Sequence, residues 1–512
     1  MGIDLGTTFS AVARVDEFGK PVVLPNRDGE TLTASVVFFD GEQPLVGTMA
    51  KRSIVSSPLD VAQFVKRAMG DPSWRFETSR GTPYRPEEIS ALVLKRLKED
   101  AERLLGAKVT DAVVTVPAYF GDAARRATID AGTIAGLRVR RILNEPTAAA
   151  LAYGLDGLVS GTVVVYDLGG GTFDVTALRI EDGDFRVLAT HGDRNLGGFD
   201  FDNLLMRLLD ERFVAAGGPS LLADDTTEAV LREKAELAKH TLTTVERTRV
   251  ALAAHGFTHT VPLTRADFED TASALLSRTR DITELVVEEA GLTWHGVDRI
   301  LLAGGATRMP MVRRMLERVS GLTPDASANP DEIVALGAAT LAQLLATDTD
   351  DGDGTASGMS TVAAPTVSGM RPVIRDVTSH GLGELVHKRG TRSTENRVII
   401  PRNSPVPAEW SRVFHTRFDD QPAIRTSITE GDDTDPAHVR IIGQEDIEVP
   451  PYPKGAPFET TLAYDENQII FVKVKDVTAD SVVGTFEILY AQNLDGDQLA
   501  RSAMRISAIS PL

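Results

Sequence analysis

Apolar residues in this chain gather in short runs that end at glycine-rich turns, and one such run leads into residues 167–174. Val163–Tyr166 is apolar throughout, which is typical of a strand buried on both faces. The sequence Asp-Leu-Gly-Gly-Gly-Thr-Phe-Asp follows, from Asp167 to Asp174. Glycines permit a tight turn whose successive N–H groups can bind phosphate oxygens, and a carboxylate at the strand end can hold hydrated Mg²⁺. The pattern therefore predicts a strand followed by a phosphate-binding turn.

The beginning of the chain repeats this pattern. Residues 1–10 read Met-Gly-Ile-Asp-Leu-Gly-Thr-Thr-Phe-Ser, with apolar residues before Asp-Leu-Gly and small hydroxyl residues after it. One copy alone would be interpreted as an ordinary hairpin turn. Two copies, each behind an apolar strand, predict a duplicated fold with two facing lobes that bind one polyphosphate between them.

The intervening sequence alternates between strand and helix patterns. Residues 86–105 have helical spacing, with Pro86 in the first turn and two glutamates at the positive end of the helix dipole. A strand is expected over 109–116, and a helix from Asp122, as N-cap, to Ala135. Glu145 begins an alanine-rich helix, where its carboxylate could be a dipole partner or could position a water or a cation.

Composition narrows the class of protein. A chain of 512 residues is too long for a single core, and its 42% hydrophobic content is ordinary for a globular protein. With no cysteine, disulfides and thiolate chemistry are excluded, and the net charge of −19 disfavours nucleic acid and anionic membranes as partners. His255 and His259 lie in a strand-and-turn pattern that does not favour a metal site. No apolar run is long enough to span a membrane, and we expect a cytoplasmic protein without a signal peptide.

Several motifs together carry a family resemblance. They are Gly2–Thr8, Val116–Phe120, Asn144–Ala150, Asp167–Asp174, Gly192–Asp193, Leu196–Asp202, Gly304–Pro310 and Asn329–Glu332. In this order, across roughly residues 1–345, the chain resembles the ATPase domain of the 70-kDa heat-shock (DnaK-type) chaperones. The resemblance implies an actin-like (ribonuclease H-like) α/β fold of two lobes. Sugar kinases and actin-like filament proteins share that fold but lack this combination of motifs.

The resemblance assigns roles to matching positions, with ATP or ADP and Mg²⁺ as ligands. Mg²⁺ would be held through water by Asp4 and Asp167. Phosphates would be bound by Gly6, Thr7, Thr8, Gly169, Gly170 and Gly171, with Thr172 at the γ-phosphate. The attacking water would be ordered by Lys66, Glu145 and Asp174. Adenosine would lie between Glu236, Lys239, His240 and Thr243 on one side and Gly304, Gly305, Ala306 and Arg308 on the other, with Asp331 closing the pocket. His240 and Ala306 depart from the residues usual in the family.

The resemblance extends more weakly into the C-terminal third. We expect an ATPase domain over 1–346, a flexible acidic and Gly/Ser-rich linker over 347–372, and an all-β sandwich domain over 373–512 without the family's helical lid. A calcium loop in the acidic stretch is the alternative, but Gly352 occupies a ligand position and no glutamate follows at the twelfth place.

The family's β-sandwich binds extended peptides through a small apolar pocket. By register from Asp376, the pocket positions fall near Glu384, Leu385, His387, Ile424 and Thr426. Burying an unpaired polar group costs about 1–3 kcal/mol, so an apolar anchor should bind poorly here and a basic peptide should be favoured.

The sequence thus supports an ATP-hydrolysing chaperone of this family that controls polypeptide binding, with a J-domain co-chaperone as a further candidate partner. The alternative is a nucleotide-switched scaffold that binds one dedicated protein partner. A sugar kinase is a distant third. The stretches 66–86 and 244–262 are shorter than is usual in the family. The second corresponds to the lobe that exchange factors bind in the family, which argues against dependence on such a factor.

Overall fold

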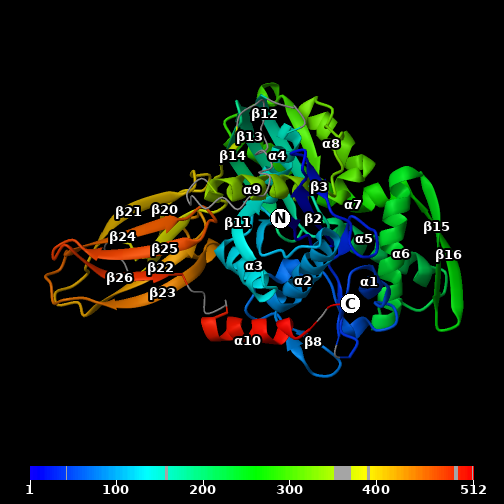
Figure 1. Ribbon diagram of the computed structural model, residues 1–512, viewed down its shortest axis with the longest axis horizontal. Helices are drawn as coiled ribbons and strands as arrows, with labels where there is room; N and C mark the ends of the chain where they lie inside the picture. Colours follow the sequence, from blue (N-terminus) through cyan, green and yellow to red (C-terminus); the bar gives the residue numbers. More distant parts are fainter. Residues whose placement is uncertain are drawn as a thin grey trace.

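The computed structural model describes residues 1–41, 43–155, 160–350, 371–388, 393–488, 494–509 and 511. The fold is mixed α/β, with two large sheets in the N-terminal part and two smaller sheets toward the C-terminus (Figure 1). Most of the segment that the sequence predicts to be a linker, residues 351–370, lies outside the described residues.

The first large sheet contains the Asp-Leu-Gly turn near the N-terminus. Its strand order is β11-β10-β1-β2-β3, with β4 paired to β2, and β1 runs parallel to β10 but antiparallel to β2. The strands are β1 (Gly2–Asp4), β2 (Phe9–Val15), β3 (Pro21–Val23), β4 (Thr33–Ala34), β10 (Asp111–Val116) and β11 (Arg138–Asn144). Helices α2 (Pro86–Leu105) and α3 (Asp122–Ile134) pack on this sheet through one buried apolar cluster that includes Val12, Leu92 and Val114.

A smaller subregion is inserted between β4 and α2. It contributes the wall of the central cavity that faces α6. Its elements are β5 (Val37–Phe38), β6 (Leu45–Val46), α1 (Thr48–Arg52), η1 (Pro58–Asp60), β7 (Val61–Ala62), η2 (Val65–Ala68), β8 (Phe76–Glu77) and β9 (Pro83–Tyr84).

The second large sheet has a related strand arrangement. Its order is β17-β12-β13-β14-β18, and β12 runs antiparallel to β13 and parallel to β17. The strands are β12 (Gly161–Leu168), β13 (Phe173–Glu181), β14 (Asp184–Asp193), β17 (Arg299–Ala303) and β18 (Val373–Arg375). The elements packed beside it are α5 (Gly198–Ala215), α6 (Asp225–Thr244), the hairpin β15 (Arg247–Ala254) and β16 (Phe257–Thr264), α7 (Arg265–Glu289), η3 (Trp294–Gly296), η4 (Gly305–Arg308) and α8 (Pro310–Ser320).

Two alanine-rich helices lie between the large sheets. They are α4 (Glu145–Leu155) and α9 (Ile333–Asp350), and they cross closely because small residues occupy the contact. A Cβ on Gly337 would stand 1.8 Å from the carbonyl oxygen of Ala148, so only glycine permits this crossing. Ala11, Ala13 and Ala339 complete the contact between α9 and β2. This packing fixes the two Asp-Leu-Gly turns against each other.

The C-terminal part contains two four-stranded antiparallel sheets, ordered β20-β19-β22-β23 and β21-β24-β25-β26. The strands are β19 (Leu382–His387), β20 (Thr394–Ile400), β21 (Ala408–His415), β22 (Ala423–Glu430), β23 (Arg440–Glu448), β24 (Pro457–Tyr464), β25 (Ile470–Asp476) and β26 (Ser481–Glu487), with η5 (Pro436–His438) before β23. Residues of both sheets, among them Ile428 and Leu462, share one buried apolar cluster.

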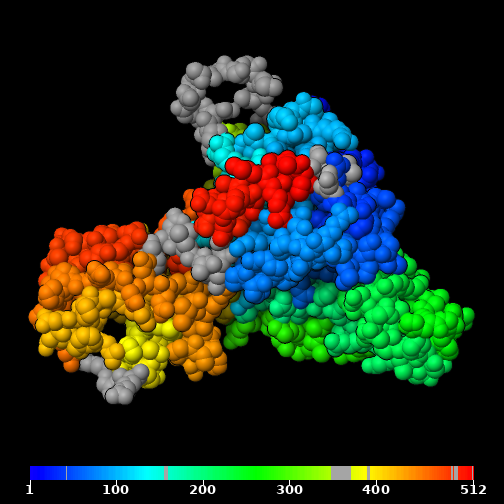
Figure 2. All heavy atoms as spheres, turned by 90° about the horizontal axis from the view of Figure 1, so that it is seen from below, coloured from blue at the N-terminus to red at the C-terminus, as the bar shows by residue number. Residues whose placement is uncertain are grey.

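The C-terminal part is attached to the N-terminal part at both of its ends. At its start, β18 pairs in parallel with β14 as the edge strand of the second large sheet. At its end, α10 (Gly496–Ser507) returns to pack on α2 and α3, where it is seen in red along the blue region in Figure 2. Ile506 of α10 is buried in the apolar cluster of the first large sheet. The sequence patterns did not predict this helix.

Two element predictions are confirmed. The predicted helix over 86–105 has those bounds, and the strand before the glycine-rich turn extends over Gly161–Leu168. The predicted N-cap of α3, Asp122, is wrong by one residue, because Gly121 is the N-cap and Asp122 is already helical. The Asp122 side chain instead accepts hydrogen bonds from the backbone N–H of Ile470 and from Arg126, both at 2.9 Å.

Candidate functional site

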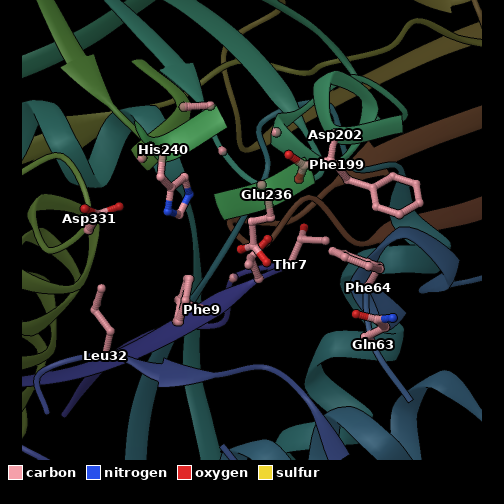
Figure 3. A pocket seen from close by; sticks show the side chains of 18 of the residues that line it. Thr7, Phe9, Leu32, Gln63, Phe64, Phe199, Asp202, Glu236, His240 and Asp331 are labelled. Carbon is pink, nitrogen blue, oxygen red and sulfur yellow. The ribbon is translucent and has the colours of Figure 1, made fainter. Parts of the chain in front are cut away.

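A cavity of about 630 Å³ lies between the two large sheets. Both Asp-Leu-Gly turns contribute to its floor, and its sides are lined by α6, by η4 with the loop before α9, and by the inserted subregion. Figure 3 shows Phe64 and Phe199 at one end of this cavity and His240, Asp331 and Leu32 at the other. The space is therefore elongated, with distinct ends.

The two Asp-Leu-Gly turns are in direct contact. A Cβ on Gly170 would stand 1.8 Å from the Thr8 hydroxyl, and one on Gly171 would stand 2.4 Å from the Thr7 methyl. Any side chain there would force the turns apart, so glycine is required for their close approach. The N–H of Gly169 closes the turn onto the carbonyl of Thr172 at 3.1 Å.

Three buried carboxylates, one half-buried carboxylate and one buried lysine surround the turns: Asp167, Asp174, Glu145, Asp4 and Lys66. Burial and the neighbouring Glu145 raise the pKa of Asp4 to about 7, and the same causes raise the pKa of Asp174 to about 8 and that of Asp167 well above its usual range. Lys66 is the cation among them, and its ammonium group forms an ion pair with Glu145. This high local density of negative charge favours the binding of further cations.

These carboxylates differ in whether they line the cavity. Asp4 accepts a hydrogen bond from Thr115 at 3.1 Å and lines the cavity. Asp174 does not line it; its side chain accepts from the backbone N–H of Tyr119 at 3.0 Å. A role for Asp174 toward a bound water would therefore have to be indirect in this conformation.

The wall formed by α6 presents charged groups that already have partners. Lys239 donates to Asp202 at 2.8 Å and to the carbonyl of Gly198 at 3.0 Å, and Glu236 accepts from Lys51 at 2.7 Å. Burial, together with the nearby Lys239 charge, lowers the pKa of His240, so its ring is neutral near pH 7.

The opposite side of this end is formed by η4 and the loop before α9. Arg308 donates to Asp331 at 2.6 Å and to Asn329 at 2.7 Å. A Cβ on Gly305 would stand 2.5 Å from a carboxylate oxygen of Asp331, so no side chain fits at this position. The absence of a side chain at Gly305 keeps this wall flat. A planar ligand could thus lie between α6 and η4.

The structure brings nearly all the predicted site residues to this one cavity. Those that line it are Asp4, Gly6, Thr7, Thr8, Lys66, Glu145, Asp167, Gly169, Gly170, Thr172, Glu236, Lys239, His240, Thr243, Gly304, Gly305, Ala306, Arg308 and Asp331. Gly171 and Asp174 lie just behind it, in contact with residues that do.

Sequence reasoning missed several residues of the lining. Phe9, Lys51, Phe64, Phe199 and Asp202 all contribute to the cavity. Phe9 and Phe199 lie inside motifs quoted above and could have been found from their position. Lys51 and Phe64 carry no local signal, because their relation to α5 and α6 depends on the tertiary fold.

The predicted peptide-pocket positions lie on β19 and β22. The side chains of Glu384 and Thr426 are buried, while His387 is exposed. Burial raises the pKa of Glu384 to about 7, although the Thr460 hydroxyl donates to its carboxylate. One carboxylate oxygen of Glu384 has no hydrogen-bond partner among the described residues.

The residues present fit a bound Mg²⁺. Asp4 and Asp167 come from facing turns, and the pKa of each is raised by burial first and then by neighbouring carboxylates, whose negative charge a divalent cation would offset. Within the described ranges, no group of three or more His, Asp or Glu side chains could hold a metal directly. Two carboxylates and coordinated waters therefore match the preference of Mg²⁺ better than an all-protein cage.

Comparison with protein-family models identifies the family. The model described as "Hsp70 protein" matches residues 1–78 and 73–505, which is nearly the whole chain. The chain therefore belongs to the Hsp70 family and is a chaperone of the Hsp70 type. None of the helices that the structure describes is both long and apolar enough to cross a membrane.

Proposed function

We propose that this chaperone binds and hydrolyses ATP in the cavity between the two large sheets, and that nucleotide state controls polypeptide binding by the C-terminal sheets. The observation that carries the proposal is the pair of facing Asp-Leu-Gly turns, each with an aspartate of raised pKa at its strand end. Backbone N–H groups in such turns suit phosphates, and an elongated cavity suits a nucleotide.

The chemistry requires positioning and charge neutralisation more than covalent steps. Asp4 and Asp167 would hold hydrated Mg²⁺, which supplies positive charge at the phosphates when bound. Thr172 would donate to the γ-phosphate. Lys66, held by its ion pair with Glu145, would orient the attacking water. Asp174 would influence this group from behind the cavity.

A chain of hydrogen bonds supports communication with the C-terminal part. Asn144 immediately precedes Glu145, and its amide donates to Asp376 at 2.7 Å, at the start of the C-terminal part. The buried guanidinium of Arg125 donates to the Asn144 side-chain oxygen at 2.7 Å. A shift of Glu145 during the nucleotide cycle would thus be transmitted to Asp376 through Asn144.

Single-turnover hydrolysis tests the enzymatic half of this proposal. Stoichiometric ATP is mixed with the full chain and Mg²⁺, and ADP formation is followed with time. We expect hydrolysis that requires Mg²⁺. Tight nucleotide binding with no conversion to ADP would refute hydrolysis while leaving a nucleotide-binding protein.

A second candidate function is a nucleotide-switched scaffold for one dedicated protein partner. The buried Glu384, with its unpartnered oxygen at a pocket position, favours it because an apolar peptide side chain would gain little there. Failure to bind any unfolded peptide, together with stoichiometric recovery of one folded partner in a nucleotide-dependent pull-down, would support the scaffold over the general chaperone.

A further inference from the structure

Two aromatic rings meet across one end of the nucleotide cavity. Phe64 lies between β7 and η2, on the side of the first large sheet, and Phe199 lies in the first turn of α5, on the side of the second. Their ring centroids are 4.3 Å apart with planes tilted by 49°. Both side chains are half-buried and line the cavity, as Figure 3 shows. The pair is thus a direct contact between the two halves that enclose the cavity.

Phe199 is tied to the phosphate turn and held by two cations. Its backbone N–H donates to the carbonyl of Gly170 at 2.8 Å. The guanidinium groups of Arg232 and Arg67 lie over its ring, 4.8 and 5.1 Å from the centroid. Cation–π attraction of this kind fixes the ring orientation. Arg232 is itself anchored by Asn203 at 2.7 Å.

Phe64 is held in an uncommon backbone conformation. Its φ of 58° and ψ of 20° place it in the left-handed region, which a bulky non-glycine residue rarely adopts. Backbone strain of this kind persists where surrounding contacts enforce it and concentrates at functional sites. Two residues later, Lys66 makes its ion pair with Glu145. The ring contact therefore links the segment that carries Lys66 to the turn that contains Gly170.

We propose that Phe64 and Phe199 form an aromatic clasp that holds the phosphate end of the cavity closed and sets the rate at which bound nucleotide leaves. This inference rests on the proposed nucleotide binding. The rings belong to segments packed on different sheets, so the cavity can widen at this end only if the ring contact breaks. Closure also keeps Lys66 near the phosphate turn, which makes both rings positioning residues for hydrolysis.

The test is the dissociation rate of a fluorescent ADP analogue from the full chain, measured by stopped-flow chase with excess ADP. Phe64→Ala and Phe199→Ala should each raise this rate by about twofold to tenfold, the range expected for loss of an aromatic pair. A double variant should release no faster than the faster single variant, because both changes break the same contact.

Control variants separate the clasp from general damage. Phe18→Ala removes a ring that is 81% exposed in the turn between β2 and β3 and should release nucleotide at the wild-type rate. Phe199→Leu keeps apolar volume and should fall between alanine and wild type, even if an alanine variant folds poorly. Wild-type release rates in folded Phe64→Ala and Phe199→Leu would overturn the clasp alone. A wild-type chain that fails to bind the analogue would overturn the proposed function, and the clasp with it.

Discussion

The cavity between the two large sheets and the predicted peptide-binding positions of the C-terminal sheets differ in how their buried charges are paired. In the cavity, Lys66 pairs with Glu145 and Lys239 with Asp202, while the remaining excess of carboxylate suits a cation that arrives with the ligand. In the C-terminal sheets, Glu384 is buried with one oxygen that has no partner among the described residues. The first region offers carboxylates that a cation arriving with the proposed nucleotide would neutralise, whereas the second buries a carboxylate where an apolar peptide anchor would need an apolar wall.

The largest effect is expected from Asp167→Asn, which tests whether the carboxylate excess in the cavity serves a cation. Removing this charge should lower Mg²⁺-dependent hydrolysis by about 10-fold to 100-fold, because Asp167 would orient the waters of the metal. The measurement is the single-turnover rate over a Mg²⁺ titration. A wild-type rate at every Mg²⁺ concentration would contradict the site assignment.

Thr172→Ala should have a smaller effect, because it removes one hydrogen bond to a charged phosphate and leaves the turn intact. We expect hydrolysis to slow about tenfold with nucleotide affinity nearly unchanged. Affinity from equilibrium titration and turnover from single-turnover kinetics are compared in the same preparation. Equal losses in both would indicate damage to the turn and would contradict a specific γ-phosphate contact.

Glu384→Leu tests the buried carboxylate of the C-terminal sheets. Replacing the buried carboxylate should stabilise the protein by about 1–3 kcal/mol at pH 8, with a gain in affinity for apolar peptides. The folded pKa of Glu384 is about 7 against an ordinary 4.5, so the folded state retains a proton between these values. Its contribution to stability therefore falls as pH rises from 4.5 to 7.

Urea unfolding at pH 4.5 and pH 8 measures this difference. The advantage of Glu384→Leu over wild type should be larger at pH 8 than at pH 4.5, and Glu384→Gln serves as the control that removes the charge with little change in shape. A leucine variant that is less stable than wild type at pH 8 would show that the Glu384 carboxylate makes stabilising contacts beyond the Thr460 hydrogen bond.

His191 is expected to give a pH dependence of opposite sign at the junction of the two parts. Its ring stacks on Tyr119, which also contacts His380 of the C-terminal part. Burial, then the charge of Arg402, lowers the pKa of His191 from 6.5 to about 4. The unfolded state binds the proton more readily than the folded state does. The contribution of neutral His191 to folding stability is therefore complete above pH 6.5 and is lost as pH falls toward 4.

The free energy of unfolding of the wild type should rise between pH 4 and pH 6.5, and His191→Phe should lose part of that rise. We expect the lost part to be about 1–2 kcal/mol after allowance for the partial exposure of the ring. Parallel urea unfolding curves at pH 5 and pH 7 provide the measurement. An unchanged difference between the two pH values would mean that His191 is protonated equally in both states.

Local motifs explain why most residues that line the cavity could be predicted from the sequence. Glycine turns, caps and the Pro86 helix start act within a few residues, so α2 and the strand before Asp167 follow directly from their patterns. Lys66 has no such local signal, so only the family resemblance assigns it to the site. The fold places it beside Glu145.

The features that the sequence did not predict depend on contacts between distant segments. Phe64 and Phe199 meet only because two sheets face each other. Helix α10 is amphipathic and its partners are far away in sequence: Ser502 donates to Glu88 at 3.0 Å, and Lys95 donates to the carbonyl of Ile506 at 2.9 Å. No local pattern in residues 494–509 indicates this surface on α2 and α3.

The central claim is that nucleotide in the cavity controls polypeptide binding by the C-terminal sheets. It is tested most directly by equilibrium binding of fluorescent unfolded peptides, one apolar and one basic, to the full chain with ATP and then with ADP. The account predicts an affinity that differs between the two nucleotides, with the basic peptide preferred. The same affinity in both nucleotide states, or no binding in either, would contradict it.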